Sequence, residues 1–197
     1  MDFLANNIYH IYNRGNNRDL IFLKEGNYIY FLQKVRKYIY PHCNLLAYVL
    51  MPDHFHFLIH ADGRTEKQES MANITRNVLS EGFRLLLSSY TKGINKQENR
   101  TGNLIQQNTK SKCVLDASNP GKDSYAITCF DYIHQNPVRA GIVDKIEDWH
   151  YSSYRDYAGL RKGTLCEQLL ARDLLGIELG AVNENRLVND ELLINIW

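Results

Sequence analysis

The sequence predicts an α+β domain with a ferredoxin-like split βαβ topology, in which helices flank a central antiparallel sheet. The first observation behind this prediction is the order of the elements, which is strand, helix, two strands, helix and a further helix. The second is the composition: 197 residues with 44% hydrophobic and 23% charged residues suit one compact domain with a modest appendage. We place the main domain at residues 1–160 and a C-terminal helical extension at residues 161–197.

The first half of the chain predicts a strand, a helix and a hairpin. Residues 6–12 are rich in Ile and Tyr and end in a cluster of turn formers, which indicates a strand. From about Glu25, apolar residues recur at helical spacing until Pro41 stops the pattern. Residues 45–50 and 54–60 read as two strands joined by a tight connection, and we expect them to pair.

The second half predicts mainly helices. Residues 67–90 show an amphipathic helical pattern, and the polar, basic stretch that follows them to about Pro120 is expected to be a mobile loop. A further helix is predicted from about Asp123 to Asn136, closed by Pro137. A Leu-rich helix over about 165–197 is expected to pack on the body of the domain or on a partner.

Composition excludes several classes of protein. No run approaches the roughly 18 apolar residues of a membrane span, and the first residues lack the pattern of a signal peptide, so we expect a cytoplasmic protein without a membrane partner. The cysteines are widely separated and form no C-x-x-C pair, which argues against structural zinc and a disulfide framework. We expect these four thiols to be reduced and mostly buried: Cys43, Cys113, Cys129 and Cys166.

Charge is balanced overall but not locally. The formal net charge is +1, yet the stretch from Thr91 to Lys122 holds six cations and only two acids. A local basic excess of this kind is typical of a phosphate-binding surface.

The run His54-Phe55-His56 lies in a predicted strand. Successive side chains of a strand point to opposite faces, so both imidazoles project from one face while Phe55 points to the other. Two imidazoles placed in this way can bind one cation, although two histidines can also simply occupy the face of a strand.

Tyr132 and Asn136 lie four residues apart near the end of a predicted helix, so their side chains share one face. Asn136 could supply a third, oxygen ligand to a cation beside Tyr132. The alternative is a core tyrosine followed by a helix-ending asparagine.

Three longer runs carry a resemblance to a known family. Residues 8–15 (IYHIYNRG), 48–56 (YVLMPDHFH) and 132–141 (YIHQNPVRAG) closely resemble the REP-associated tyrosine transposases, which belong to the single-tyrosine HUH transposases. Shorter runs at residues 90–92, 102–106 and 149–154 match the family in the same order. Two departures, Ile105 and the pair His150-Tyr151, bear on DNA specificity more than on chemistry.

The resemblance implies a site and a reaction. It implies that His54 and His56 bind a divalent cation, Mg²⁺ or Mn²⁺, that Asn136 is the third ligand and that Tyr132 is the catalytic nucleophile. It further implies cleavage of single-stranded or hairpin DNA through a 5′-phosphotyrosine with release of a 3′ hydroxyl, and a monomer in preference to a homodimer.

Elementary chemistry agrees with this assignment. A phenol with an ordinary pKa near 10 is a poor nucleophile at neutral pH and needs a polarised electrophile. A divalent cation supplies that polarisation at a phosphate, although two imidazoles would also suit zinc.

DNA binding needs cations for phosphates and aromatic faces for bases. We expect His10, His60 and His134 to pack or hydrogen-bond outside the metal site. A non-catalytic or domesticated DNA-binding protein of the same fold is the alternative, and a zinc hydrolase is disfavoured because no acidic general base stands at a recognisable spacing. The candidate DNA contacts are Tyr12, Arg14, Arg18, Tyr90, Lys92, Lys96 and Arg139.

Overall fold

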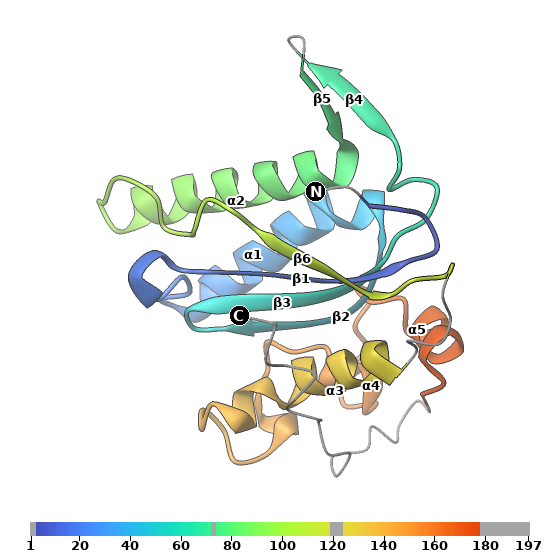
Figure 1. The fold of residues 1–197 in the computed structure, drawn as a ribbon. Helices are drawn as coiled ribbons and strands as arrows, with labels where there is room; N and C mark the ends of the chain where they lie inside the picture. The colour runs from blue at the N-terminus through green and yellow to red at the C-terminus, as the bar shows by residue number, and fades with distance from the viewer. Residues whose placement is uncertain (1–2, 72–73, 119–123, 178–197) are drawn as a thin grey trace.

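A four-stranded antiparallel sheet forms the centre of the protein (Figure 1). The computed structural model describes residues 3–71, 74–118 and 124–177. The strands of the sheet are β1 (Ile8–Arg14), β2 (Asn44–Met51), β3 (His54–His60) and β6 (Lys110–Leu115). Their order in the sheet is β2-β3-β1-β6, and every neighbouring pair is antiparallel. This order is that of a split βαβ fold, and it confirms the predicted fold class.

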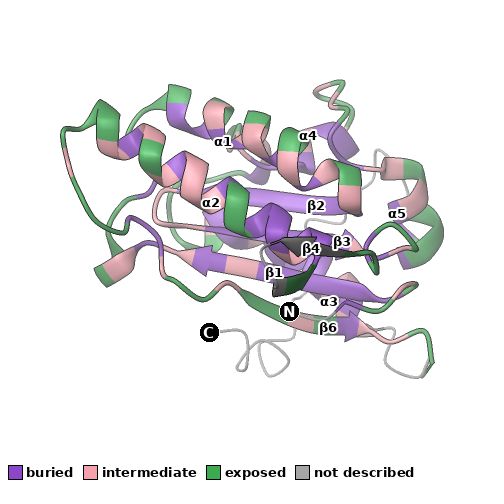
Figure 2. Ribbon diagram, turned by 90° about the horizontal axis from the view of Figure 1, so that it is seen from above, coloured by how far each residue is buried: buried purple, intermediate pink, exposed green. Residues whose placement is uncertain are grey.

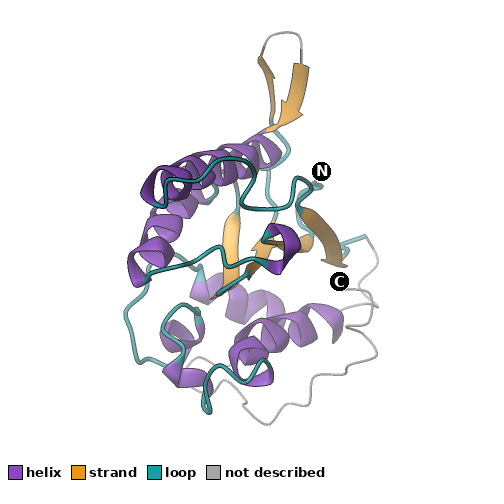
Figure 3. Cartoon of the chain, turned by 90° about the vertical axis from the view of Figure 1, so that its left-hand side faces the viewer, coloured by secondary structure: helices purple, strands orange, loops and turns teal. Residues whose placement is uncertain are grey.

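Helices cover both faces of the sheet (Figures 1 and 3). One face carries α1 (Glu25–Tyr38) and α2 (Val78–Gln97), and the other carries α3 (Ser124–Arg139), α4 (Tyr154–Tyr157) and α5 (Gln168–Leu175). Short 3-10 helices lie at η1 (Asn16–Arg18), η2 (Tyr40–His42) and η4 (Ile146–Asp148). Because both faces are covered, β2 and β3 are buried along almost their whole length (Figure 2).

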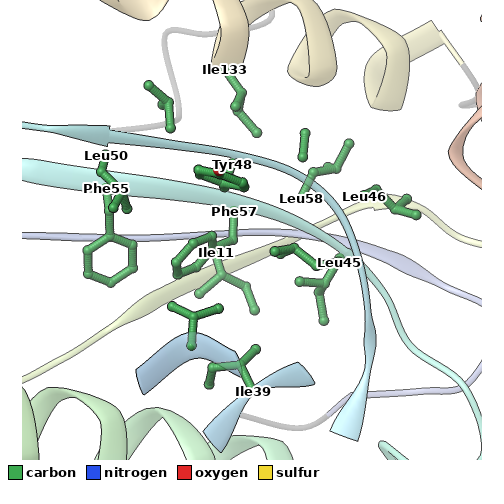
Figure 4. Packing of buried hydrophobic residues seen from close by; sticks show 14 of the residues in the cluster. Ile11, Ile39, Leu45, Leu46, Tyr48, Leu50, Phe55, Phe57, Leu58 and Ile133 are labelled. Atoms are coloured by element: carbon green, nitrogen blue, oxygen red, sulfur yellow. The ribbon is translucent and has the colours of Figure 1, made fainter. Parts of the chain in front are cut away.

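Alternation along β3 sends different side chains to the two layers. Phe55 packs on Phe31 of α1 with ring centroids 5.2 Å apart, and Phe57 packs on Phe83 of α2 at 6.2 Å. On the opposite face, the buried side chain of Ile133 points from α3 toward the sheet (Figure 4). The core on the α1 and α2 side therefore fixes β3 firmly, and the face toward α3 is left for the histidines.

The start of the second long helix differs from the prediction. Residues predicted as its first turns form a hairpin of β4 (Gln68–Met71) and β5 (Ile74–Asn77) that projects from the body (Figure 1). The side chain of Asn77 accepts hydrogen bonds from the backbone N–H groups of Leu79 and Ser80, which caps α2 at Val78. The predicted start near residue 67 is therefore wrong. The Asn77 cap, and not the spacing of apolar residues, determines where α2 begins.

The basic stretch after α2 is also more ordered than the loop that was predicted. Helix α2 continues to Gln97, and Lys110–Leu115 forms the edge strand β6 beside β1. An edge strand exposes one side to solvent, so β6 is mostly polar and exposed (Figure 2) and lacks a strong apolar signal.

Pro137 does not close α3. The helix runs on to Arg139 with Pro137 inside it. The backbone N–H of Ala140 donates to the carbonyl of Asn136 at 2.9 Å, and that of Gly141 donates to Val138 at 2.9 Å. Proline removes only one helical donor and its φ suits a helix, so the last turn forms around it.

The C-terminal extension begins on the edge of the sheet. The backbone N–H of Glu167 donates to the carbonyl of Leu45 in β2 at 2.8 Å, and Ala171 and Leu175 of α5 are buried. Helix α5 ends at Gly176, whose φ of 62° is left-handed, so the long helix predicted here is wrong at this point. The remainder of that prediction, residues 178–197, lies outside the described residues.

Two expectations from composition can be compared with the structure. Within the described ranges, no helix has both the length and the apolar character needed to span a membrane. None of the four cysteines forms a disulfide; Cys43, Cys129 and Cys166 are buried, whereas Cys113 is exposed on β6.

Candidate active site

The two histidines of β3 face the layer that contains α3. The β1–β3 register pairs Tyr12 with His56 and Arg14 with His54, so these four side chains share one face of the sheet. His56 is fully buried, and the side chain of His54 is 12% exposed. The strand alternation predicted from sequence is therefore confirmed, and the open side of the pair is at His54.

Each histidine is held through Nδ1 by a neighbour. His54 Nδ1 lies 2.6 Å from Asp53 Oδ1, and the hydrogen bond with His54 is the main cause that lowers the pKa of Asp53. His56 Nδ1 lies 2.9 Å from Nε2 of His10 on β1. In both rings the contact leaves Nε2 as the nitrogen that points away from the orienting group.

Burial keeps the inner histidines neutral. Desolvation lowers the pKa of His56 well below its usual 6.5, and the charges of His10 and His54 lower it further. Burial, with a smaller effect of Lys112, lowers the pKa of His10 to about 3. A neutral imidazole is the form that binds metal ions.

Tyr132 of α3 packs directly on this pair. Its ring meets that of His56 edge to face, with centroids 5.5 Å apart, and Tyr132 is 6% exposed. Near the start of the same helix, Tyr125 lies under Lys112, which pairs with His10 in the sheet. Helix α3 thus runs from the His10 end of the sheet toward the His54 end.

Asn136 lies one turn beyond Tyr132 in that direction and is 6% exposed. No cluster of three or more His, Cys, Asp or Glu side chains that could hold a metal ion occurs among the described residues. The amide oxygen of Asn136 is a side-chain atom of a type that can coordinate a divalent cation.

Six of the candidate DNA contacts lie in three places. Arg14 and the half-buried Tyr12 stand next to the histidines, and the ring of Tyr12 stacks on His56 at 5.7 Å. Arg18 lies in η1 and Arg139 in the last turn of α3, and both are exposed. Lys92 and Lys96 are exposed on α2.

Tyr90 lies elsewhere. It is fully buried between α1 and α2, and its hydroxyl donates to the carbonyl of Ile21 at 2.6 Å. A ring in this position presents no face to a nucleic-acid base, so Tyr90 is not part of a DNA-binding surface.

A groove of about 710 Å³ lies between α2 and the segment that leads to β6. That segment is fastened to the end of β1, because the backbone N–H of Gln106 donates to Arg14 and that of Asn16 donates to Leu104. Gln106 also lines a smaller cavity of about 70 Å³ together with Tyr12, Arg14 and Lys110. The groove lining includes Arg84, Lys92, Asn95, Asn103, Gln106, Gln107 and Asn108.

Sequence reasoning missed several residues of the site. His10, Asp53, Tyr125, Gln106 and Lys110 were not singled out as site residues, although His10 and Asp53 stand inside the family-like runs. The position of Asp53 directly before His54 was a usable signal. The pairing of His10 with His56 depends on strand register, which local spacing does not give.

Comparison with known proteins adds a fold relationship. No family model matches the chain, and no curated protein matches it significantly. Among solved structures, the chain is similar to a REP-associated tyrosine transposase bound to a REP hairpin, with a TM-score of 0.57 and 15% sequence identity, over 81% of this chain and 83% of that chain. At this identity the likeness shows a shared fold.

Proposed function

We propose that this protein is a metal-dependent single-strand DNA endonuclease and strand transferase of the transposase class, with Tyr132 as its nucleophile. The main support is the edge-to-face contact of Tyr132 with His56, which joins the only tyrosine of the proposed helix motif to the histidine pair. The shared fold with a transposase whose structure contains a REP hairpin supports a related substrate.

His54, His56 and Asn136 would hold a divalent cation, and we propose Mg²⁺ or Mn²⁺. The Nδ1 contacts with Asp53 and His10 leave Nε2 of each ring as the nitrogen that would coordinate the cation. When bound, the cation would act as a Lewis acid on the scissile phosphate.

Tyr132 would then perform the transfer itself. Its phenolic oxygen forms a bond to the 5′ phosphorus, the bond from phosphorus to the 3′ oxygen breaks, and the phenolic proton ends on the released 3′ hydroxyl. The phosphotyrosine conserves the energy of the broken bond, so rejoining needs no ATP. Burial of the ring holds the phenol in one position, which favours an in-line approach.

The DNA strand would follow the groove toward the histidines. Lys92 and Arg84 offer charge to phosphates, and the amide side chains of the lining offer donors and acceptors to base edges. Gln106 joins the groove to the small cavity at Tyr12 and Arg14, and the ring of Tyr12 stacks on His56. This path connects a polar binding surface to the proposed metal ligands.

We further propose that one chain suffices for cleavage. Tyr132 and His56 meet within a single chain, so the nucleophile does not need to be supplied by a second copy. A monomer acting on cytoplasmic DNA is therefore the simplest arrangement.

The experiment that tests this proposal is a cleavage assay on an oligonucleotide hairpin with single-stranded flanks, in Mn²⁺ and in chelator. We expect metal-dependent cleavage in one flank and none of the matched duplex. Tight binding without cleavage in any divalent metal would contradict the proposal and support the alternative, a DNA-binding protein that retains only the fold.

A further inference from the structure

His10 occupies the centre of β1 and touches the proposed metal site without belonging to it. Its side chain is fully buried, and its ring stacks on that of His56 with centroids 5.0 Å apart and planes 13° apart. Its Nε2 lies 2.9 Å from Nδ1 of His56. On the strand, the ring of His10 also stacks on Tyr12 at 5.0 Å.

Two neutral imidazoles in this geometry share one hydrogen atom, so only two arrangements exist. In the first, His10 donates from Nε2, and His56 accepts at Nδ1 and carries its own proton on Nε2. In the second, His56 donates from Nδ1 to His10, and the lone pair of His56 lies on Nε2. Only the second arrangement lets His56 coordinate a cation through Nε2.

We propose that His10 is a positioning residue that accepts the Nδ1–H of His56 and thereby fixes the metal-binding tautomer of His56. The inference rests on the proposed function, because it assumes that His56 binds the cation. His10 orients His56 as Asp53 orients His54, because His10 contacts Nδ1 of His56 and Asp53 contacts Nδ1 of His54.

The two orienting groups differ in one respect. Asp53 is an acceptor only, whereas His10 must place its own proton on Nδ1 when it accepts at Nε2. That Nδ1 is buried and has no hydrogen-bond partner within the described part of the chain. The second arrangement therefore places a buried N–H on His10 Nδ1, a cost that coordination of a cation by His56 Nε2 would offset. When a cation replaces the proton on His56 Nε2, the shared hydrogen would pass from His10 Nε2 to His56 Nδ1, and His10 Nδ1 would take up a proton.

Histidine-ring nitrogen NMR tests this directly on the wild-type protein. With ¹⁵N-labelled histidine and Zn²⁺ as a diamagnetic probe, we expect the His56 proton on Nδ1 and the His10 proton on Nδ1. A zinc-bound His56 that coordinates through Nδ1, or a His10 that is protonated at Nε2 in the zinc-bound state, would overturn the inference.

Two variants separate hydrogen bonding from packing. His10→Phe keeps a flat ring against His56 but cannot accept a hydrogen bond, whereas the amide oxygen of His10→Gln reaches the place of the lost Nε2. We expect Mn²⁺ affinity, measured by calorimetry, to fall about 10–100-fold in His10→Phe, as for other outer-shell partners, and to be largely restored in His10→Gln. His60→Phe, at the far end of β3, is the matched control and should bind Mn²⁺ like the wild type.

The outcomes are distinguishable. Wild-type binding of Mn²⁺ with unchanged affinity in His10→Phe would overturn this inference and leave the proposed function standing. Equal loss in His10→Phe and His10→Gln, with thermal unfolding unchanged, would show that the ring acts by shape and would also overturn it. Failure of the wild type to bind Mn²⁺ or Zn²⁺ would overturn both. If His10→Phe does not fold, the wild-type NMR measurement decides.

Discussion

The rings of Tyr132 and His56 meet edge to face, with centroids 5.5 Å apart and planes at 81°. One ring comes from α3 and the other from β3, so the contact exists only once the helix has packed on the sheet. It brings the proposed nucleophile to the proposed metal ligands in one chain.

Loss of the metal ligands should separate activity from stability. His54→Ala removes a partly exposed side chain, so we expect a free energy of unfolding within about 0.5–1 kcal/mol of wild type. Cleavage should fall by more than roughly 10–100-fold, which is the loss typical when a residue that only contacts a metal ligand is replaced. His56→Ala removes a fully buried ring and the partner of His10, and should also destabilise the fold by about 1–3 kcal/mol.

Urea unfolding and the cleavage assay measure the two effects. Asn136→Ala should resemble His56→Ala in activity, because it removes the proposed oxygen ligand. Wild-type cleavage by a His54→Ala, His56→Ala double variant in chelator would refute the metal site.

DNA binding should prefer a hairpin with single-stranded flanks over a perfect duplex and should weaken as salt rises. If three or more phosphates are neutralised, the log–log slope of affinity against salt should be steeper than about −2. Lys92→Ala, in the groove, should reduce that slope by about 0.7, the value for one single-strand contact.

Lys37→Ala on α1 is the matched control, because Lys37 is exposed but does not line the groove. Fluorescence anisotropy over a salt series measures both variants. An equal slope for Lys92→Ala and Lys37→Ala would remove the groove from the proposed DNA path.

Stability should decrease in mild acid because of the buried histidines. Burial lowers the pKa of His10 and of His134 to about 3, from an ordinary value of 6.5. These rings bind protons less readily in the folded state than in the unfolded state. The free energy of unfolding is therefore highest above about pH 6.5. It falls as the pH drops from there toward 3, with a slope of about 1.4 kcal/mol per pH unit for each such histidine.

Urea midpoints between pH 7 and pH 5 test this in metal-free protein. His134→Gln, away from the strand pair, should make the decline shallower. Its Nε2 lies 2.8 Å from Ser153 Oγ, so some loss of stability at pH 7 is expected as well. A midpoint that does not change with pH would show that these rings titrate normally.

Much of the fold could be predicted from the sequence, because local signals and packing agree there. Pro41 ends the pattern of α1, and the alternation in His54–His60 sets the faces of β3. The hairpin before α2 was missed because Met71 and Ile74 fit a helical spacing as well as a strand. Strand β6 was missed because it lies at the edge of the sheet, where polar residues replace the apolar pattern of a buried strand.

The site could be predicted only in part for a related reason. His54 with His56 and Tyr132 with Asn136 are local pairs, which strand and helix periods place on one face. The contact between His10 and His56 depends on the pairing of β1 with β3, and the burial of Tyr90 on the packing of α1 against α2. Neither of these long-range relationships is encoded in local spacing.

The most direct test of the account is to identify the residue that becomes joined to DNA. After incubation with the hairpin oligonucleotide and Mn²⁺, peptide mass spectrometry should find the nucleotide on Tyr132 alone among the 13 tyrosines. Tyr132→Phe keeps the ring packing against His56 and should bind the hairpin normally, but should give neither the adduct nor the free 3′ end. Tyr125→Phe, on the same helix, is the control and should still form the adduct. An adduct on another residue, or wild-type cleavage by Tyr132→Phe, would contradict the account.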